Sequence, residues 1–246
     1  CLGFILRGIF LCRKQEIDWF LYGLRNLFPE AWRELVAPLS DTERNDILSA
    51  YHQRLMNPDP AIHMPAARTW STYEGSCSTL LPNPATVRYF ASDTVALGLA
   101  RMEAHYFMHD IFLPENSLLD NVHKLHNIPA TIVQGRYDAV CPIVSADDLH
   151  HAWPQAEYII IDDAGHSVWE PGIQAALIRA TDPQTLVIEL PERCCGRAAD
   201  VVGLLGVLEQ CNQGLQRAGP AEIAQGCRGP GTHVRVGVVQ GVEDIG

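Results

Sequence analysis

Residues 134–167, QGRYDAVCPIVSADDLHHAWPQAEYIIIDDAGHS, carry the strongest structural signal in this chain. The apolar run 130–133 leads into them, and a second apolar run, 158–161, lies near their end. A segment of helical composition separates the two runs. Short apolar runs joined through a helix predict a β–α–β unit with parallel strands. We therefore expect an α/β fold built on a parallel sheet.

Each expected strand is followed by a residue that can do acid–base chemistry. Asp138 follows the first run, and His166 follows the second. The carboxyl ends of parallel strands meet at one edge of a sheet, so we expect these side chains to lie close together. An acid followed by a histidine matches the last two members of a Ser–Asp–His triad. Either residue alone would more commonly belong to an ordinary turn or loop, so the hypothesis depends on the pair.

The segments around these two residues resemble a known family. GRYDAVCP (135–142), DLHHAWPQA (148–156) and AGHSVWEP (164–171) resemble the C-terminal part of proline iminopeptidases, or prolyl aminopeptidases. These are serine peptidases of the α/β-hydrolase superfamily. The resemblance runs from about residue 6 to 182, through LRGIFLCRKQEIDWF, WSTYEGSCSTLLPNP and ARMEAHYF. It implies a partial α/β-hydrolase fold with flanking helices and an inserted all-helical cap subdomain.

The resemblance also implies catalytic and substrate-binding roles. Asp138 would orient His166, which would act as the general base for a serine. Glu74 and Glu103 fall on the cap positions that bind the substrate amine. Carboxylates in a partly desolvated pocket suit that task because they favour a charged amine over a blocked one. The family usually has Trp before the first of these glutamates, whereas this chain has Tyr73, so we expect a pocket of the same charge but of different detailed shape.

Three further residues receive roles by the same resemblance. Phe10 would line an apolar slot for the pyrrolidine ring, with Phe20 nearby, and Arg7 would anchor the substrate or the cap carboxylates. Two simpler interpretations stay open: the phenylalanines could be core residues, and Arg7 could form a structural ion pair.

Four regions are expected along the chain. Residues 1–20 form a core strand and its exit, 21–125 the helical cap, 126–183 the C-terminal part of the hydrolase core, and 184–246 a tail of unknown origin. The tail contains no aromatic residue and no lysine and matches no part of the family. We expect it to add little to the core, because aromatic side chains are major contributors to core burial.

Local patterns predict helices throughout the cap. Ser40 and Glu43 form a capping box that should begin a helix with Leu48, Tyr51 and Leu55 on its apolar face. Another helix is expected over 62–74. A further one should carry Glu103, and its apolar face is marked by Val95, Leu99, Met102 and Tyr106.

Composition restricts the partners. The net charge of −11 argues against binding to nucleic acid, and no apolar run is long enough to span a membrane. The apolar start, residues 1–12, is interpreted as a buried strand rather than a signal peptide. The eight cysteines lack metal-binding spacing, so we expect reduced thiols, a cytoplasmic location, and neither metal nor organic cofactor. The expected partners are small peptides with a free N-terminal proline, and the oligomeric state is left open.

The nucleophile itself is missing from the sequence. A Gly-x-Ser-x-Gly elbow, which would present it, is absent. Because the chain opens inside an expected core strand, we expect the nucleophile in upstream sequence and this chain alone to be inactive. The leading hypothesis is a serine aminopeptidase that releases N-terminal proline. The alternatives are another α/β-hydrolase, such as an esterase or amidase, and a non-catalytic truncated product or binding module.

Overall fold

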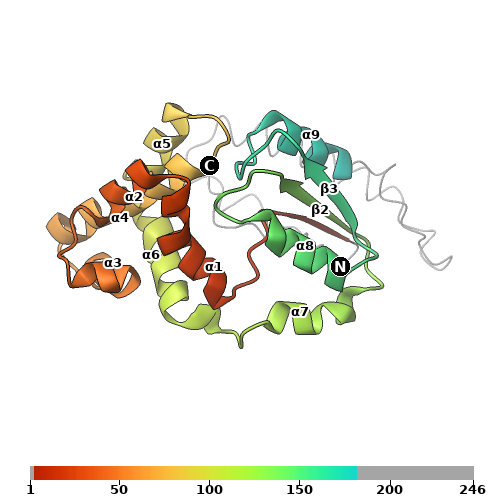
Figure 1. Cartoon of the computed structure of the whole chain (residues 1–246), viewed down its shortest axis with the longest axis horizontal. Helices are drawn as coiled ribbons and strands as arrows, with labels where there is room; N and C mark the ends of the chain where they lie inside the picture. Colours follow the sequence, from red (N-terminus) through yellow and green to blue (C-terminus); the bar gives the residue numbers. More distant parts are fainter. Residues whose placement is uncertain (1–2, 182–246) are drawn as a thin grey trace, which may run out of the picture.

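The computed structural model describes residues 3–181, which form a parallel sheet and a bundle of helices beside it (Figure 1). The sheet has the order β1-β2-β3, with these bounds: β1 (Phe4–Arg7), β2 (Ala130–Gly135) and β3 (Glu157–Ile161). Both pairings are parallel, with Arg7 opposite Val133 and Gly135 opposite Ile161. The expected β–α–β unit and the partial α/β-hydrolase fold are confirmed.

Most of the rest of the described chain is helical. The α-helices are α1 (Lys14–Asp18), α2 (Pro29–Val36), α3 (Ile47–Leu55), α4 (Pro60–Cys77), α5 (Pro84–Phe90), α6 (Ala96–Met108), α7 (Ser117–Asn121), α8 (Ile143–Ala152) and α9 (Pro171–Ala180). A π-helical turn, Trp19–Gly23, continues α1. Within residues 3–181 there is no helix both long and apolar enough to cross a membrane.

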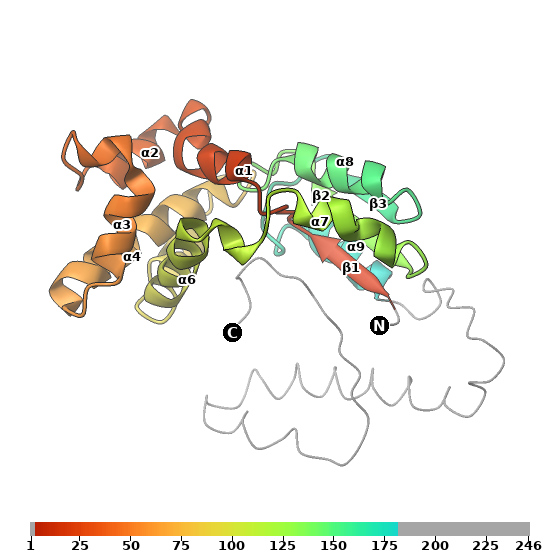
Figure 2. The same ribbon diagram turned by 90° about the horizontal axis from the view of Figure 1, so that it is seen from below.

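The sheet is covered on both faces (Figure 2). Ile132 packs toward Leu149 of α8, whereas its neighbour Val133 packs toward Ile173 of α9. Successive side chains of a strand point to opposite faces, so a strand buried on both sides is apolar at consecutive positions. This explains why the neighbours Ile132 and Val133 are both apolar and both fully buried.

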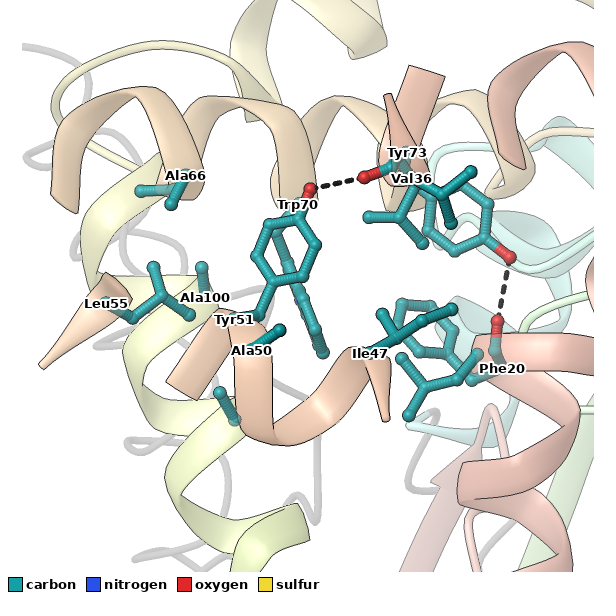
Figure 3. Close-up of a cluster of buried hydrophobic side chains, with 14 of the residues drawn as sticks. Phe20, Val36, Ile47, Ala50, Tyr51, Leu55, Ala66, Trp70, Tyr73 and Ala100 are labelled. Carbon is teal, nitrogen blue, oxygen red and sulfur yellow. Dashed lines mark hydrogen bonds between the residues drawn. The ribbon is translucent and has the colours of Figure 1, made fainter. Parts of the chain in front are cut away.

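Helices α1, α2, α3, α4 and α6 pack around a core of their own, which we call the cap core, whereas Leu119 of α7 packs with the cluster of the sheet and α8. Tyr51 and Trp70 are fully buried in it, with ring centroids 5.3 Å apart. The hydroxyl of Tyr73 donates to the carbonyl oxygen of Phe20 at 2.7 Å (Figure 3). Ile17 and Phe20, which belong to the predicted exit from the core strand, are buried in this core. The predicted tail, 184–246, lies outside the described residues.

The start of α3 differs from the expected one. Ser40 and Glu43 do form the reciprocal bonds of a capping box, with Ser40 N–H donating to Glu43 at 2.8 Å. That box closes the short 3-10 turn Glu43–Asn45 instead of α3. Helix α3 is capped by Asp46, whose carboxylate accepts from the N–H of Ser49 at 3.0 Å. An Asp at the N-cap satisfies a free amide in the first turn of the helix, so it sets the start of the helix.

The buried face of α6 also corrects the prediction. Leu99 is buried as expected, but Met102 and Tyr106 are 47% and 44% exposed. The face that packs into the bundle is made of alanines: Ala96, Ala100 and Ala104. Small side chains allow close approach of neighbouring helices, and a search for large apolar residues overlooks them.

Candidate active site

Asp138 and His166 form a buried hydrogen-bonded pair at the carboxyl edge of the sheet. Asp138 lies in the loop after β2, and His166 lies in the loop after β3. Nδ1 of His166 is 2.9 Å from Oδ2 of Asp138 and 3.1 Å from Oδ1. Each residue is only 6% exposed. The structure thus brings together the two side chains that the sequence singled out.

Gln134 and a backbone amide orient the carboxylate of Asp138. Nε2 of Gln134 donates to Oδ2 of Asp138 at 3.1 Å and to the carbonyl oxygen of Cys141 at 3.0 Å. The N–H of Cys141 donates to Oδ1 at 2.8 Å. Gln134 is a positioning residue that the sequence reasoning missed. The available signal was a polar residue within a strand buried on both faces, since such a residue needs buried partners.

The pair favours a protonated imidazole. Burial by itself lowers the pKa of His166, but the Asp138 carboxylate outweighs burial and raises that pKa well above its usual value. Burial raises the pKa of the neighbouring Cys141 thiol, which is only 9% exposed. Because Nδ1 of His166 faces Asp138, Nε2 is the nitrogen left for proton exchange with a reactant.

Gly8 leaves room for the imidazole ring. Its φ is 55°, in the left-handed region that glycine adopts readily. A Cβ at this position would lie 3.0 Å from Cε1 of His166. The chain therefore leaves the sheet at Gly8, and the strand expected over residues 1–12 ends at Arg7.

Arg7 and Glu74 are buried next to the His166 loop. Nη1 of Arg7 donates to the carbonyl oxygen of His166 at 3.1 Å. Glu74 is 4% exposed and lies in the last turn of α4. Ser78, which follows α4, accepts at its carbonyl oxygen from the N–H groups of His166 at 3.1 Å and Ser167 at 2.8 Å. Helix α4 thus carries Glu74 to the same corner of the molecule as His166.

Glu103, Phe10 and Phe20 surround an aromatic cluster in the cap. Oε2 of Glu103 accepts from Nε1 of Trp70 at 2.7 Å. The rings of Phe20 and Phe107 lie 5.6 and 6.4 Å from that of Trp70, between centroids. Phe10 contacts Phe107 at 5.8 Å and is only partly buried, whereas Phe20 is 5% exposed. Phe20 is therefore a core residue, and Phe10 lies at the edge of the cluster.

The serines near these motifs have other partners. Ser76 and Ser78 donate to carbonyl oxygens one turn back in α4, and the hydroxyl of Ser167 accepts from an amide in its own loop. In the described part of the chain, no serine hydroxyl is hydrogen-bonded to His166. The same residues contain no group of three or more His, Cys, Asp or Glu side chains that could hold a metal ion.

Comparison with curated proteins gives a consistent relationship. A probable proline iminopeptidase of Leptolyngbya boryana is 48% identical over 184 residues, which are 74% of this chain and 57% of that protein. For the proline iminopeptidase of Arabidopsis thaliana, the identity is 48% over 183 residues, which are 73% of this chain and 48% of that protein. The proline iminopeptidase of Xanthomonas citri is 44% identical over 180 residues, which are 72% of this chain and 58% of that protein. This chain is related to the proline iminopeptidases.

The relationship covers part of those proteins. The chain spans about half the length of the curated proline iminopeptidases it matches. No family model matches the chain. The resemblance seen in the short motifs therefore extends over most of this sequence, while about half of each relative lies outside the matched region.

Proposed function

We propose that this chain is the cap and C-terminal core of a proline iminopeptidase, which releases N-terminal proline from small peptides. The observation that carries the proposal is the buried Asp138–His166 pair beside the end of α4, where Glu74 is also buried. The relationship to proline iminopeptidases favours this activity over that of an esterase or amidase.

His166 acts as the general base in this mechanism. Its Nε2 takes the proton of a serine hydroxyl during attack on the peptide carbonyl and later gives it to the leaving amine. Asp138 holds the ring and stabilises the imidazolium formed in between. The serine belongs to a Gly-x-Ser-x-Gly elbow that this sequence does not contain, so we infer that upstream sequence of the same protein supplies it.

Glu74 and Glu103 select the free amino terminus. Glu74 is buried and Glu103 is partly buried, and a carboxylate removed from water favours a positively charged ammonium over the neutral nitrogen of a blocked peptide. The partly buried Phe10, next to Phe107, offers an apolar surface for the pyrrolidine ring. Arg7 supports the site through the carbonyl oxygen of His166.

The test compares this chain with the longer protein encoded by its gene, using prolyl and acetyl-prolyl arylamides. We expect the longer protein to cleave only the substrate with a free amine, and the chain alone to be inactive. In the longer protein, His166→Ala should abolish turnover, and Asp138→Asn should lower kcat about ten-thousand-fold. His151→Ala, at an exposed position on α8, is the control and should retain full activity. Equal cleavage of both substrates would contradict the amine-recognition proposal, and a longer protein without activity would contradict the function.

A further inference from the structure

The side chain of Glu170 joins two segments that are distant in the sequence. Glu170 is the N-cap residue of α9, but its side chain makes no bond to the free amides of that helix. Its Oε2 accepts from the N–H of Gly165 at 2.9 Å, and its Oε1 accepts from the N–H of Leu80 at 2.9 Å. One carboxylate therefore bridges the His166 loop and the segment that leaves α4. We call this arrangement the Glu170 clamp.

The two segments are in direct contact at the clamp. A Cβ on Gly165 would lie 2.8 Å from the nitrogen of Leu80 and 3.0 Å from Oε1 of Glu170. Any residue larger than glycine would push the segments apart. The clamp is thus a close-packed joint between the cap and the loop that carries His166.

Consecutive amides around His166 donate to the side chain of Glu170 and to the end of α4. The amide of Gly165 donates to Glu170, and those of His166 and Ser167 donate to the carbonyl oxygen of Ser78, at the end of α4. A loop without regular backbone pairing depends on such bonds for its position. Hydrogen bonds to an ionised carboxylate are stronger than those between neutral groups.

We propose that Glu170 is a positioning residue that fixes the His166 loop to the end of α4, so that docking of the cap determines where the imidazole lies. Helix α4 also carries Glu74, so the clamp links the amine-recognition position to the base. A displacement of about 1 Å in a catalytic group can lower the rate about a hundredfold. A contact that fixes the position of His166 would therefore affect turnover. The proposal rests on the proposed function only in taking His166 as the base.

The clamp can be tested on the full chain without any catalytic assay. Glu170→Gln keeps the shape but replaces one acceptor oxygen by an NH₂ group, and Glu170→Ala removes both acceptors. We expect amide hydrogen exchange at Gly165 or Leu80 to become about tenfold faster in Glu170→Gln, and faster at both in Glu170→Ala. NMR titration should show the midpoint of His166 moving toward its ordinary value as the loop loosens from Asp138.

Two controls separate positioning from general stability. Glu115→Gln makes the same change of charge at an exposed site and should alter neither readout. Ile47→Val, in the cap core, should lower the unfolding midpoint but leave the titration of His166 unchanged. Unchanged exchange at both amides in both Glu170 variants would overturn the proposal. So would an equal shift of the His166 titration in Ile47→Val. Because neither readout requires turnover, a failure of the proposed activity would leave the result interpretable.

Discussion

The absence of a side chain at Gly8 leaves space for the ring of His166. Adding a single methyl group there, by substitution with alanine, tests this. Gly8→Ala would force a left-handed residue to carry a Cβ 3.0 Å from Cε1 of His166. We expect a loss of about 1–2 kcal/mol in the free energy of unfolding, measured by urea denaturation. Gly98→Ala is the matched control, because its Cβ would have no neighbour within 4 Å and it lies in α6. That variant should be as stable as the wild type or up to about 1 kcal/mol more stable. Equal stability of Gly8→Ala would contradict the close contact.

The raised pKa of His166 makes stability depend on pH. A histidine whose folded pKa lies above its unfolded value binds its proton more tightly in the folded state. This stabilisation is complete below about pH 6.5 and is lost as the pH rises through the folded pKa. In Asp138→Asn, the carboxylate that raises the pKa of His166 is removed, and burial, which lowers that pKa, remains. The pKa of His166 should therefore fall and the stabilisation should disappear.

Urea unfolding between about pH 5.5 and pH 9 measures this effect. The stability difference between wild type and Asp138→Asn should be largest at the acidic end and shrink as the pH rises. Asp147→Asn, beside the exposed His151, provides the control and should leave the profile of the wild type unchanged. A difference that grows with pH would reverse the sign and refute the assignment.

Helix α3 provides a test of which residue begins a helix. Asp46 accepts from the N–H of Ser49 at 3.0 Å and from its hydroxyl at 2.6 Å. Asp46→Ala should therefore lower the free energy of unfolding by about 1 kcal/mol, whereas Asp46→Asn should lose much less. Ser40→Ala disturbs only the preceding 3-10 turn and should have the smaller effect. If the effect of Ser40→Ala exceeds that of Asp46→Ala, the capping box governs the helix after all.

Local patterns predicted those features whose causes are local. The β–α–β unit follows from two apolar runs around a helix, and the convergence of strand ends then located Asp138 and His166. The alanine face of α6 was missed because alanine gives little signal in a hydrophobic pattern. Its packing depends on the neighbouring helices.

The supporting residues of the site could not be found in this way. Gln134 faces the amide of Ile9, 125 positions away, and Glu170 accepts from Leu80, 90 positions away. The first contact exists because β1 and β2 are neighbours although the whole cap lies between them in the sequence. The second exists because the end of α4 packs against the loop after β3. Catalytic residue types can be recognised from motifs, but the groups that orient them are set by the three-dimensional arrangement.

A second joint, formed by ionic groups, ties the cap to the sheet on the side of α8. Arg13, which lies between β1 and α1, donates to Asp148 of α8 at 2.8 Å and to Glu16 of α1 at 3.2 Å. Glu16 also accepts from the hydroxyl of Ser145. Arg13 and Glu16 are 7% and 6% exposed, so this ion pair is largely removed from water. It joins the start of α1 to α8.

Arg13→Ala should be strongly destabilising because it leaves Glu16 buried without its cation. Breaking a buried pair by removing one partner costs about 3–5 kcal/mol, which urea unfolding would show as a large shift of the midpoint. The neighbouring Lys14 is the matched control, since it pairs with Asp18 at 2.6 Å on the surface. Exposed pairs contribute little, so Lys14→Ala should leave the midpoint nearly unchanged. Similar midpoints for the two variants would mean that water reaches Glu16 and that the cap is not held to α8 through this pair.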